Sequence, residues 1–408
     1  MIGQADGPTW QDALLLAGLS YRGGVLRDAM VEAALRRGLE DLAPDWELVW
    51  GPVEARVPPD FFDVCAMYVA RHRRRDHQYV VAVRGTNPTS LADWTLGDFN
   101  VATQVAWPFD GSARVSTSTA FGLRMLLGLR WIPGPSLQRT ATNVLTTWRL
   151  PKGLVDVVRG VVSHSERWTR FYLRPMERRL QEWVCEIATR QKLPQVVGRD
   201  LAAAVRVQAA DLEVTAALGA SGGMGVVAFL RDAAKTKALD VVVTGHSKGG
   251  ALAPTLALWL HQARGDWDAS GGGRVGCCAF AGPTPGDGAF ARLLERELGV
   301  RFVRVHNTND VVTHAWDDAG LAGIPTLFGA QTIELQQTLD DLRKGLAAGE
   351  PPLDYAQPDR PPVRQMPFAG TLVPSRTFAA EFVHQHMDAY LDHAGFHGKV
   401  DAIDLFLG

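Results

Sequence analysis

Short apolar runs alternate with amphipathic stretches over much of the chain. Parallel strands that are covered by helices on both sides have such runs, which are rich in β-branched residues and apolar on both faces. The runs of this kind are 77–85, 239–245, 275–282 and 301–307. Helical periodicity follows two of them, at 251–264 and 288–298. Strands that alternate with helices predict an α/β fold, in which helices flank a mostly parallel central sheet.

The segment 111–195 interrupts this alternation. Its pattern is largely helical, and it carries 14 Lys/Arg against 5 Asp/Glu, so its net charge is +9 and that of the remainder is −11. Its tryptophans are Trp131, Trp148, Trp168 and Trp183. We predict a basic helical insertion, or cap, within an α/β core formed by 1–110 and 196–408. A proline-rich stretch at about 345–375 is predicted to be an extended surface loop.

The overall composition is that of an ordinary globular protein. Of the 408 residues, 46% are hydrophobic and 21% charged, with a net charge of −2, which favours neither a nucleic-acid partner nor a disordered chain. The first residues lack the basic start of a secretory signal peptide, and no apolar run is long enough to span a membrane. The 4 cysteines have no zinc or disulfide spacing. We expect reduced thiols in a cytoplasmic protein, unless export uses a route other than the Sec pathway.

Residues 241–252 read VVVTGHSKGGAL, which is a strand pattern, a Gly-x-Ser-x-Gly turn and the start of a helix. This is the layout of a nucleophile elbow, in which a strained turn exposes a serine hydroxyl above a helix N-terminus. Gly245 and Gly249 are required because a Cβ at either position would strike neighbouring backbone. Ser247 is therefore the candidate nucleophile. The alternative is a glycine-rich turn with an incidental serine.

Four stretches, in the same order, resemble the class 3 (fungal-type) lipases, a family of α/β-hydrolases. The elbow is similar to the family's TGHSLGGALA, with lysine in place of the usual leucine. The other stretches are VVAVRGT with SLADWTLGDFN (80–86 and 90–100), FAGPTPGDGAFA (280–291) and VRVHNTNDVV (303–312). The resemblance implies an α/β-hydrolase fold and a serine hydrolase of carboxylic esters that forms an acyl-enzyme and needs neither metal nor cofactor.

The resemblance also indicates the acid of a Ser-His-Asp triad. In α/β-hydrolases the members follow one another in the order serine, acid, histidine. Asp310 comes just after a predicted strand and lies in the stretch that carries the family's triad aspartate. Asp317 and Asp318 are alternatives, and Asp310 could also serve only to cap its loop.

The candidate base lies near the C-terminus. HMDAYLDH at 386–393 resembles a family stretch in which the first histidine is catalytic, which indicates His386. If 379–395 is one helix, His386 and Tyr390 share a face, whereas His384 points elsewhere. His384 stays open as the alternative base.

An oxyanion hole needs two donors. The backbone N–H of Lys248 is one candidate, and by resemblance Thr86 is the other. A cation at a helix N-terminus is unfavourable by about 0.3–1 kcal/mol, so we expect the Lys248 side chain to pair with a carboxylate, Asp93 or Asp98. Arg84 is expected to be structural and to pair with a carboxylate.

In the family, an amphipathic lid follows the Arg-Gly-Thr motif, which corresponds here to 87–110 with Trp94, Leu96, Phe99 and Trp107. Thr86 and Ser247 are 161 positions apart, which exceeds the family's usual spacing, and the basic segment fills the difference. Two interpretations of that segment stay open. In the first, its cationic and aromatic residues contact a lipid interface. In the second, its arginines form a solvated face and its tryptophans belong to a core.

The predicted function is a lipase or esterase that hydrolyses lipid esters such as triacylglycerols. A phospholipase A1-type enzyme or effector that acts on membrane phospholipids is the first alternative. A non-catalytic module on a hydrolase fold, which binds a membrane or a protein partner, is the second. No nucleic-acid partner is expected. The sequence leaves acyl-chain length, head-group preference and oligomeric state open.

Overall fold

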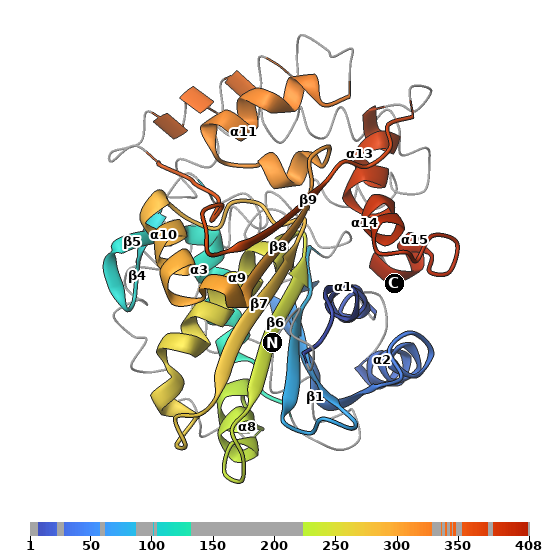
Figure 1. Ribbon diagram of the computed structural model, residues 1–408, viewed down its shortest axis with the longest axis vertical. Coiled ribbons are helices and arrows are strands. Elements are labelled where there is room, and N and C mark those ends of the chain that lie inside the picture. The colour runs from blue at the N-terminus through green and yellow to red at the C-terminus, as the bar shows by residue number, and fades with distance from the viewer. Residues whose placement is uncertain are drawn as a thin grey trace.

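The computed structural model shows a seven-stranded sheet with strand order β1-β2-β3-β6-β7-β8-β9 (Figure 1). The structure describes residues 7–22, 28–57, 62–86, 101, 104–131, 223–328, 353–373 and 378–406, with residues 336, 339–340, 343–344 and 346–347. The strands are β1 (Trp46–Val57), β2 (Phe62–His72), β3 (Gln78–Val83), β6 (Asp240–His246), β7 (Arg274–Phe280), β8 (Phe302–Asn307) and β9 (Arg364–Phe368).

From β3 onward, neighbouring strands run parallel, whereas β1 and β2 add two antiparallel pairings at one edge. The central strands are buried on both faces. On β6, Val241 and Val243 belong to one core cluster and Val242 to the other. This explains the continuous apolar runs in the sequence and confirms the predicted mostly parallel α/β sheet.

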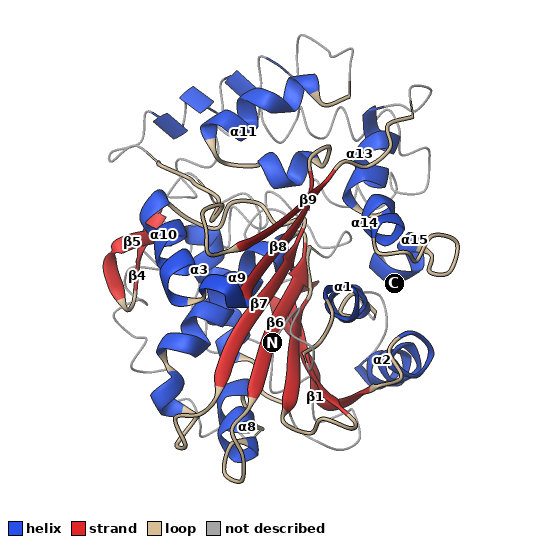
Figure 2. Cartoon of the chain, viewed as in Figure 1, coloured by secondary structure: helices blue, strands red, loops and turns tan. Residues whose placement is uncertain are grey.

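Helices cover both faces of the sheet (Figure 2). One face packs against α3 (Thr117–Gly128), α8 (Val226–Ala233), α9 (Lys248–Gln262) and α10 (Gly288–Glu297). The other packs against α1 (Trp10–Leu19), α2 (Asp28–Leu42), α14 (Asp388–His393) and α15 (Ala402–Phe406). Two more helices, α11 (Asp318–Gly323) and α13 (Phe378–His386), lie towards the carboxyl ends of the strands. No helix in the described part of the chain is both long and apolar enough to cross a membrane.

The prediction of a surface loop over 345–375 is wrong for β9, which pairs in parallel with β8 at the edge of the sheet. Every residue of β9 is at least partly exposed, and Pro367 lies within it. Proline is tolerated in an edge strand because no ladder hydrogen bond is needed on the outer side. Only Met366 and Phe368 of β9 pack against the core, and both are partly exposed, so the short strand gives no apolar run in the sequence.

The first part of the predicted insertion packs with the core. A hairpin of β4 (Gln104–Trp107) and β5 (Asp110–Ser116) leads into α3, and side chains of β5 and α3 belong to the main core cluster. Residues 132–195 lie outside the described residues, so the division into core and insertion stays a prediction. Trp131 and Met224, on either side of this part of the chain, exchange two backbone hydrogen bonds of 3.0 and 2.7 Å.

Trp107 was predicted to be an apolar lid residue, and the structure places it elsewhere. It is 1% exposed, its ring packs against Phe290 of α10, and its Nε1 donates to Gln262 Oε1 at 2.7 Å. Trp107 is therefore a core residue. Trp94, Leu96 and Phe99 lie outside the described residues.

Candidate active site

The turn between β6 and α9 has the geometry of a nucleophile elbow. Ser247 has φ 60° and ψ −128°, a conformation that non-glycine residues rarely adopt and that occurs where the surrounding structure imposes it. A Cβ on Gly245 would lie 2.3 Å from the backbone oxygen of Gly249, and one on Gly250 would lie 2.3 Å from that of Phe280. Only glycine fits at these positions, and the close approach of helix to sheet holds the serine in its strained turn.

His386 and Asp310 meet at the carboxyl ends of the strands. The His386 Nδ1 lies 3.0 and 2.9 Å from the two carboxylate oxygens of Asp310. Asp310 is fully buried, and its Oδ1 also accepts from the backbone N–H of Val312 at 3.0 Å. A carboxylate only accepts hydrogen bonds, so Nδ1 carries the proton and Nε2 is left with the lone pair that a general base needs.

The alternative residues are not brought to this pair. The Asp317 carboxylate caps α11 by accepting from Gly320 N at 2.8 Å, and that of Asp318 binds Arg343. His384 lies beside Asp388 instead, with Nδ1 3.6 Å from Oδ2. Of the sequence candidates, the structure joins only Asp310 and His386.

His246 connects His386 to the elbow. Its ring centroid lies 4.7 Å from that of His386, and its Nε2 donates to the His386 backbone oxygen at 2.8 Å. The hydroxyl of Tyr21 lies 3.3 Å from the His246 Nδ1 and 3.1 Å from its backbone oxygen. Burial holds the pKa of His246 well below its usual value, so the ring is neutral. His246 packs beneath the elbow, and its contacts with His386 hold the end of α13 against the residue that precedes Ser247.

The expected single helix over 379–395 is instead two helices. Met387, with φ −127° and ψ −70°, separates α13 from α14. His386, the last residue of α13, and Tyr390 on α14 both reach Asp310, whose Oδ2 accepts from the Tyr390 hydroxyl at 3.0 Å. No signal in the sequence marks this break.

Tyr390 and Asn307 form a further set of hydrogen bonds around Asp310. Tyr390 OH accepts from the backbone N–H of Asn307 at 3.0 Å, and Asn307 Nδ2 donates to the backbone and side-chain oxygens of Gln385 at 2.8 and 2.7 Å. Burial raises the pKa of Tyr390 well above its usual value, so the hydroxyl stays protonated and donates to the carboxylate. Both residues lie in the stretches that resemble the family, but their roles were not predicted.

Replacing Tyr390 with phenylalanine is expected to lower kcat about tenfold with little change in KM. The substitution removes one donor from Asp310, and a tenfold change corresponds to about 1.4 kcal/mol, close to the net value of a hydrogen bond to a charged group. Tyr355→Phe is a matched control, because it removes a buried hydroxyl outside this site. That hydroxyl donates to the backbone oxygen of Val101 at a distance of 2.7 Å. Equal losses of kcat in the two variants would show that Tyr390 supports only the fold.

The two candidate oxyanion donors lie on neighbouring elements. β3 and β6 pair in parallel with Val83 opposite Gly245, so Thr86, three residues further on, follows the strand next to the elbow. Lys248 is the first residue of α9, where backbone N–H groups point out of the helix end, and its side chain is buried. Asp93 and Asp98 lie outside the described residues, so the expected partner of Lys248 stays a prediction.

Arg84 is structural, as expected. Its Nη1 lies 3.4 Å from Glu54 Oε1, and both side chains are almost fully buried. The pair links the end of β3 to the antiparallel part of the sheet.

Comparison with known proteins identifies the domain that contains the elbow. Residues 182–318 match the family model for lipase (class 3), a range that includes Ser247 and Asp310 and ends before His386. The chain carries a class 3 lipase domain. With this domain the protein is a carboxylic ester hydrolase, as predicted.

Several solved lipase structures are similar to this chain. The crystal structure of M37 lipase is similar over 98% of this chain and 96% of that chain, with 21% sequence identity and a TM-score of 0.68. A lipase from Rhizopus microsporus var. chinensis matches with 15% identity over 76% of this chain and 70% of that chain, at a TM-score of 0.37. Lipase II from Rhizopus niveus matches with 15% identity over 75% and 74%, at a TM-score of 0.36. No curated protein matches the chain. The likeness to M37 lipase confirms the predicted α/β-hydrolase fold.

Proposed function

We propose that the protein hydrolyses lipid esters through a triad of Ser247, His386 and Asp310. The observation that carries this proposal is the buried hydrogen bond from His386 Nδ1 to Asp310. The ring of His386 also lies against that of His246, the residue that precedes Ser247. A serine hydroxyl is a weak nucleophile until a neighbouring base accepts its proton, and the bond to Asp310 prepares His386 for that task.

In this mechanism the Ser247 hydroxyl attacks the carbonyl carbon of the ester while His386 Nε2 accepts its proton. Asp310 stabilises the imidazolium that forms. The backbone N–H of Lys248 and a donor of Thr86 stabilise the negative charge on the carbonyl oxygen. His386 then protonates the leaving alcohol, which leaves an acyl-enzyme on Ser247. Water, activated by the same histidine, releases the carboxylic acid and restores the serine.

The class 3 lipase domain supports a lipid ester as substrate, and acylglycerols are the proposed class. A phospholipase A1-type activity is the second candidate, because the segment 111–195 carries a net charge of +9, which would attract anionic head groups. A module that only binds a membrane or a partner would not need the bond between His386 and Asp310.

A substrate panel separates these candidates. We expect hydrolysis of p-nitrophenyl esters and of triacylglycerol emulsions, and covalent modification of Ser247 by a fluorophosphonate, located by peptide mass spectrometry. Faster hydrolysis of phosphatidylglycerol vesicles than of triacylglycerol would identify a phospholipase. A folded protein that neither hydrolyses any ester nor reacts with the fluorophosphonate would be a binding module.

A further inference from the structure

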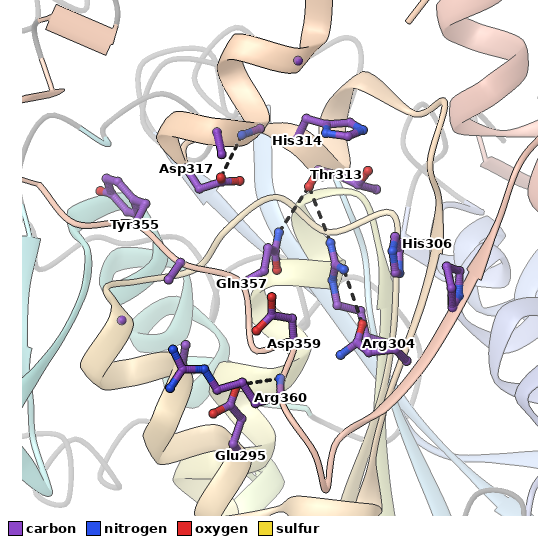
Figure 3. A pocket seen from close by; sticks show the side chains of 18 of the residues that line it. Glu295, Arg304, His306, Thr313, His314, Asp317, Tyr355, Gln357, Asp359 and Arg360 are labelled. Atoms are coloured by element: carbon purple, nitrogen blue, oxygen red, sulfur yellow. Dashed lines mark hydrogen bonds between the residues drawn. The ribbon is translucent and has the colours of Figure 1, made fainter.

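A cavity lies beside the turn that carries Asp310, with Thr308, Thr313 and His314 in its wall (Figure 3). It has a volume of about 770 Å³ and is bordered by α10, β8, the 3₁₀ helix η7 (Val311–His314), α11 and the chain from 355 to 367. Ser247, Asp310 and His386 do not line it. On β8, Arg304 and His306 point into this cavity, whereas Val303 and Val305 point to the opposite face of the sheet and pack in the cluster with α1. The cavity is therefore separate from the proposed ester site.

Arg304 is a buried charge at the wall of this cavity. Its residue is 8% exposed, and burial lowers its pKa to about 10, so it remains charged at neutral pH. Its guanidinium donates to Gln365 Oε1 and to the backbone oxygen of Thr313, in both cases at the long distance of 3.5 Å. Within the described part of the chain, no carboxylate lies within ion-pair distance of it. A buried guanidinium has five donors, and it is strongly stabilised when a carboxylate or phosphate group receives them in pairs.

The carboxylates that also line the cavity are occupied or lie at its rim. Asp317 caps α11, and Glu295 accepts from the backbone N–H of Arg360 at 3.0 Å. Asp359 is exposed and interacts with Arg304 only through its charge. The cations Arg292 and Arg360 are also exposed. Glu295 is buried and keeps its negative charge, so the three carboxylates and the three arginines that line the cavity balance, and Arg304 is a buried cation without a carboxylate at ion-pair distance in the described part of the chain.

His306 adds a polar group to the same wall. Burial and the neighbouring Arg304 lower its pKa to about 3, so the ring is neutral. Its Nδ1 is buried and has no hydrogen-bond partner among the described residues. A neutral imidazole provides one donor and one acceptor, which suits a ligand that carries both oxygen atoms and a hydroxyl.

We propose that this cavity binds a small polar molecule through an oxyanion group, a carboxylate or a phosphate, held by the Arg304 guanidinium and flanked by His306. The planar fork of arginine matches two oxygens of such a group. Thr313, Gln357 and Gln365 also line the cavity, so polar side chains lie around the guanidinium.

Calorimetric titration of the full chain tests this proposal, with inorganic phosphate, glycerol 3-phosphate and butyrate at neutral pH and fixed ionic strength. Saturable binding of at least one probe is expected. If glycerol 3-phosphate binds more tightly than inorganic phosphate, the natural ligand is a lipid head group. If the two bind equally, the ligand is the free phosphate anion. If only butyrate binds, the ligand is a carboxylate. Ser247→Ala is expected to bind as the native protein does, because the serine lies outside the cavity. Absence of saturable binding for all three would overturn the proposal.

Substitutions at the cavity identify the group responsible. Arg304→Gln is expected to weaken binding at least tenfold. A buried arginine can also matter for folding, so the affinity of a second variant, Asp359→Asn, is measured as well. This variant removes a negative charge at the rim and is expected to strengthen binding severalfold. Asp266→Asn, which makes the same charge change at an exposed site that does not line the cavity, is the matched control. Equal affinities in the two asparagine variants would reject the site.

Discussion

Replacing Ser247 with alanine will lower kcat for ester hydrolysis by on the order of 10⁶-fold, to the level left by the remaining groups of the site. The variant keeps a Cβ, so the strained turn at φ 60° is the same for alanine as for serine and the fold is expected to persist. Only the hydroxyl that forms the acyl-enzyme is lost. The measurement is the initial rate with a p-nitrophenyl ester, together with the melting temperature of both proteins.

Ser112→Ala is the control for this experiment, because Ser112 is exposed on β5 and its hydroxyl donates only to Asp110. Its rate is expected to equal that of the native protein. If Ser247→Ala retained most of the activity with an unchanged melting temperature, another residue would be the nucleophile.

Asp310→Asn will lower kcat about 10⁴-fold, with the fold retained. The carboxylate accepts hydrogen bonds from His386 Nδ1, Val312 N and Tyr390 OH. An amide keeps the shape but provides only one oxygen, and its NH₂ group favours the tautomer with the proton on Nε2. Nε2 could then no longer accept the proton of Ser247.

Asp317→Asn makes the same change in a carboxylate that caps α11 and does not contact His386. Asparagine is as good an N-cap as aspartate, so activity and stability are expected to stay near the native values. A similar loss in both variants would remove Asp310 from the triad and return Asp317 to consideration. The ratio of the two kcat values is the quantity to measure.

The central part of the fold could be predicted from the sequence because burial leaves a strong pattern. Strand β6 is buried on both faces, and the turn after it requires glycine at positions where a Cβ would strike backbone. Such constraints restrict the residue type at each position. Asp310 could be predicted for a related reason, since it follows the end of β8 at the edge where functional groups of parallel sheets gather.

The contacts that complete the site could not be predicted in this way. The break at Met387 has neither proline nor glycine to mark it, and it follows from packing of two short helices against the end of the sheet. The contact of Tyr21 with His246 joins residues 225 positions apart, which no local pattern reveals. Edge strand β9 was missed because its exposed residues have no apolar periodicity.

The paired hydrogen bonds between Trp131 and Met224 have an evolutionary consequence. They hold Trp131 and Met224 side by side, so the two chain positions that flank residues 132–223 are fixed relative to each other. Where two chain positions are held together in this way, each doubling of the chain length between them costs only about 0.6 kcal/mol of closure entropy. Descendants of one ancestral gene can therefore gain, lose or exchange sequence between these anchors while the elbow and the Asp310 turn inherit an unchanged framework.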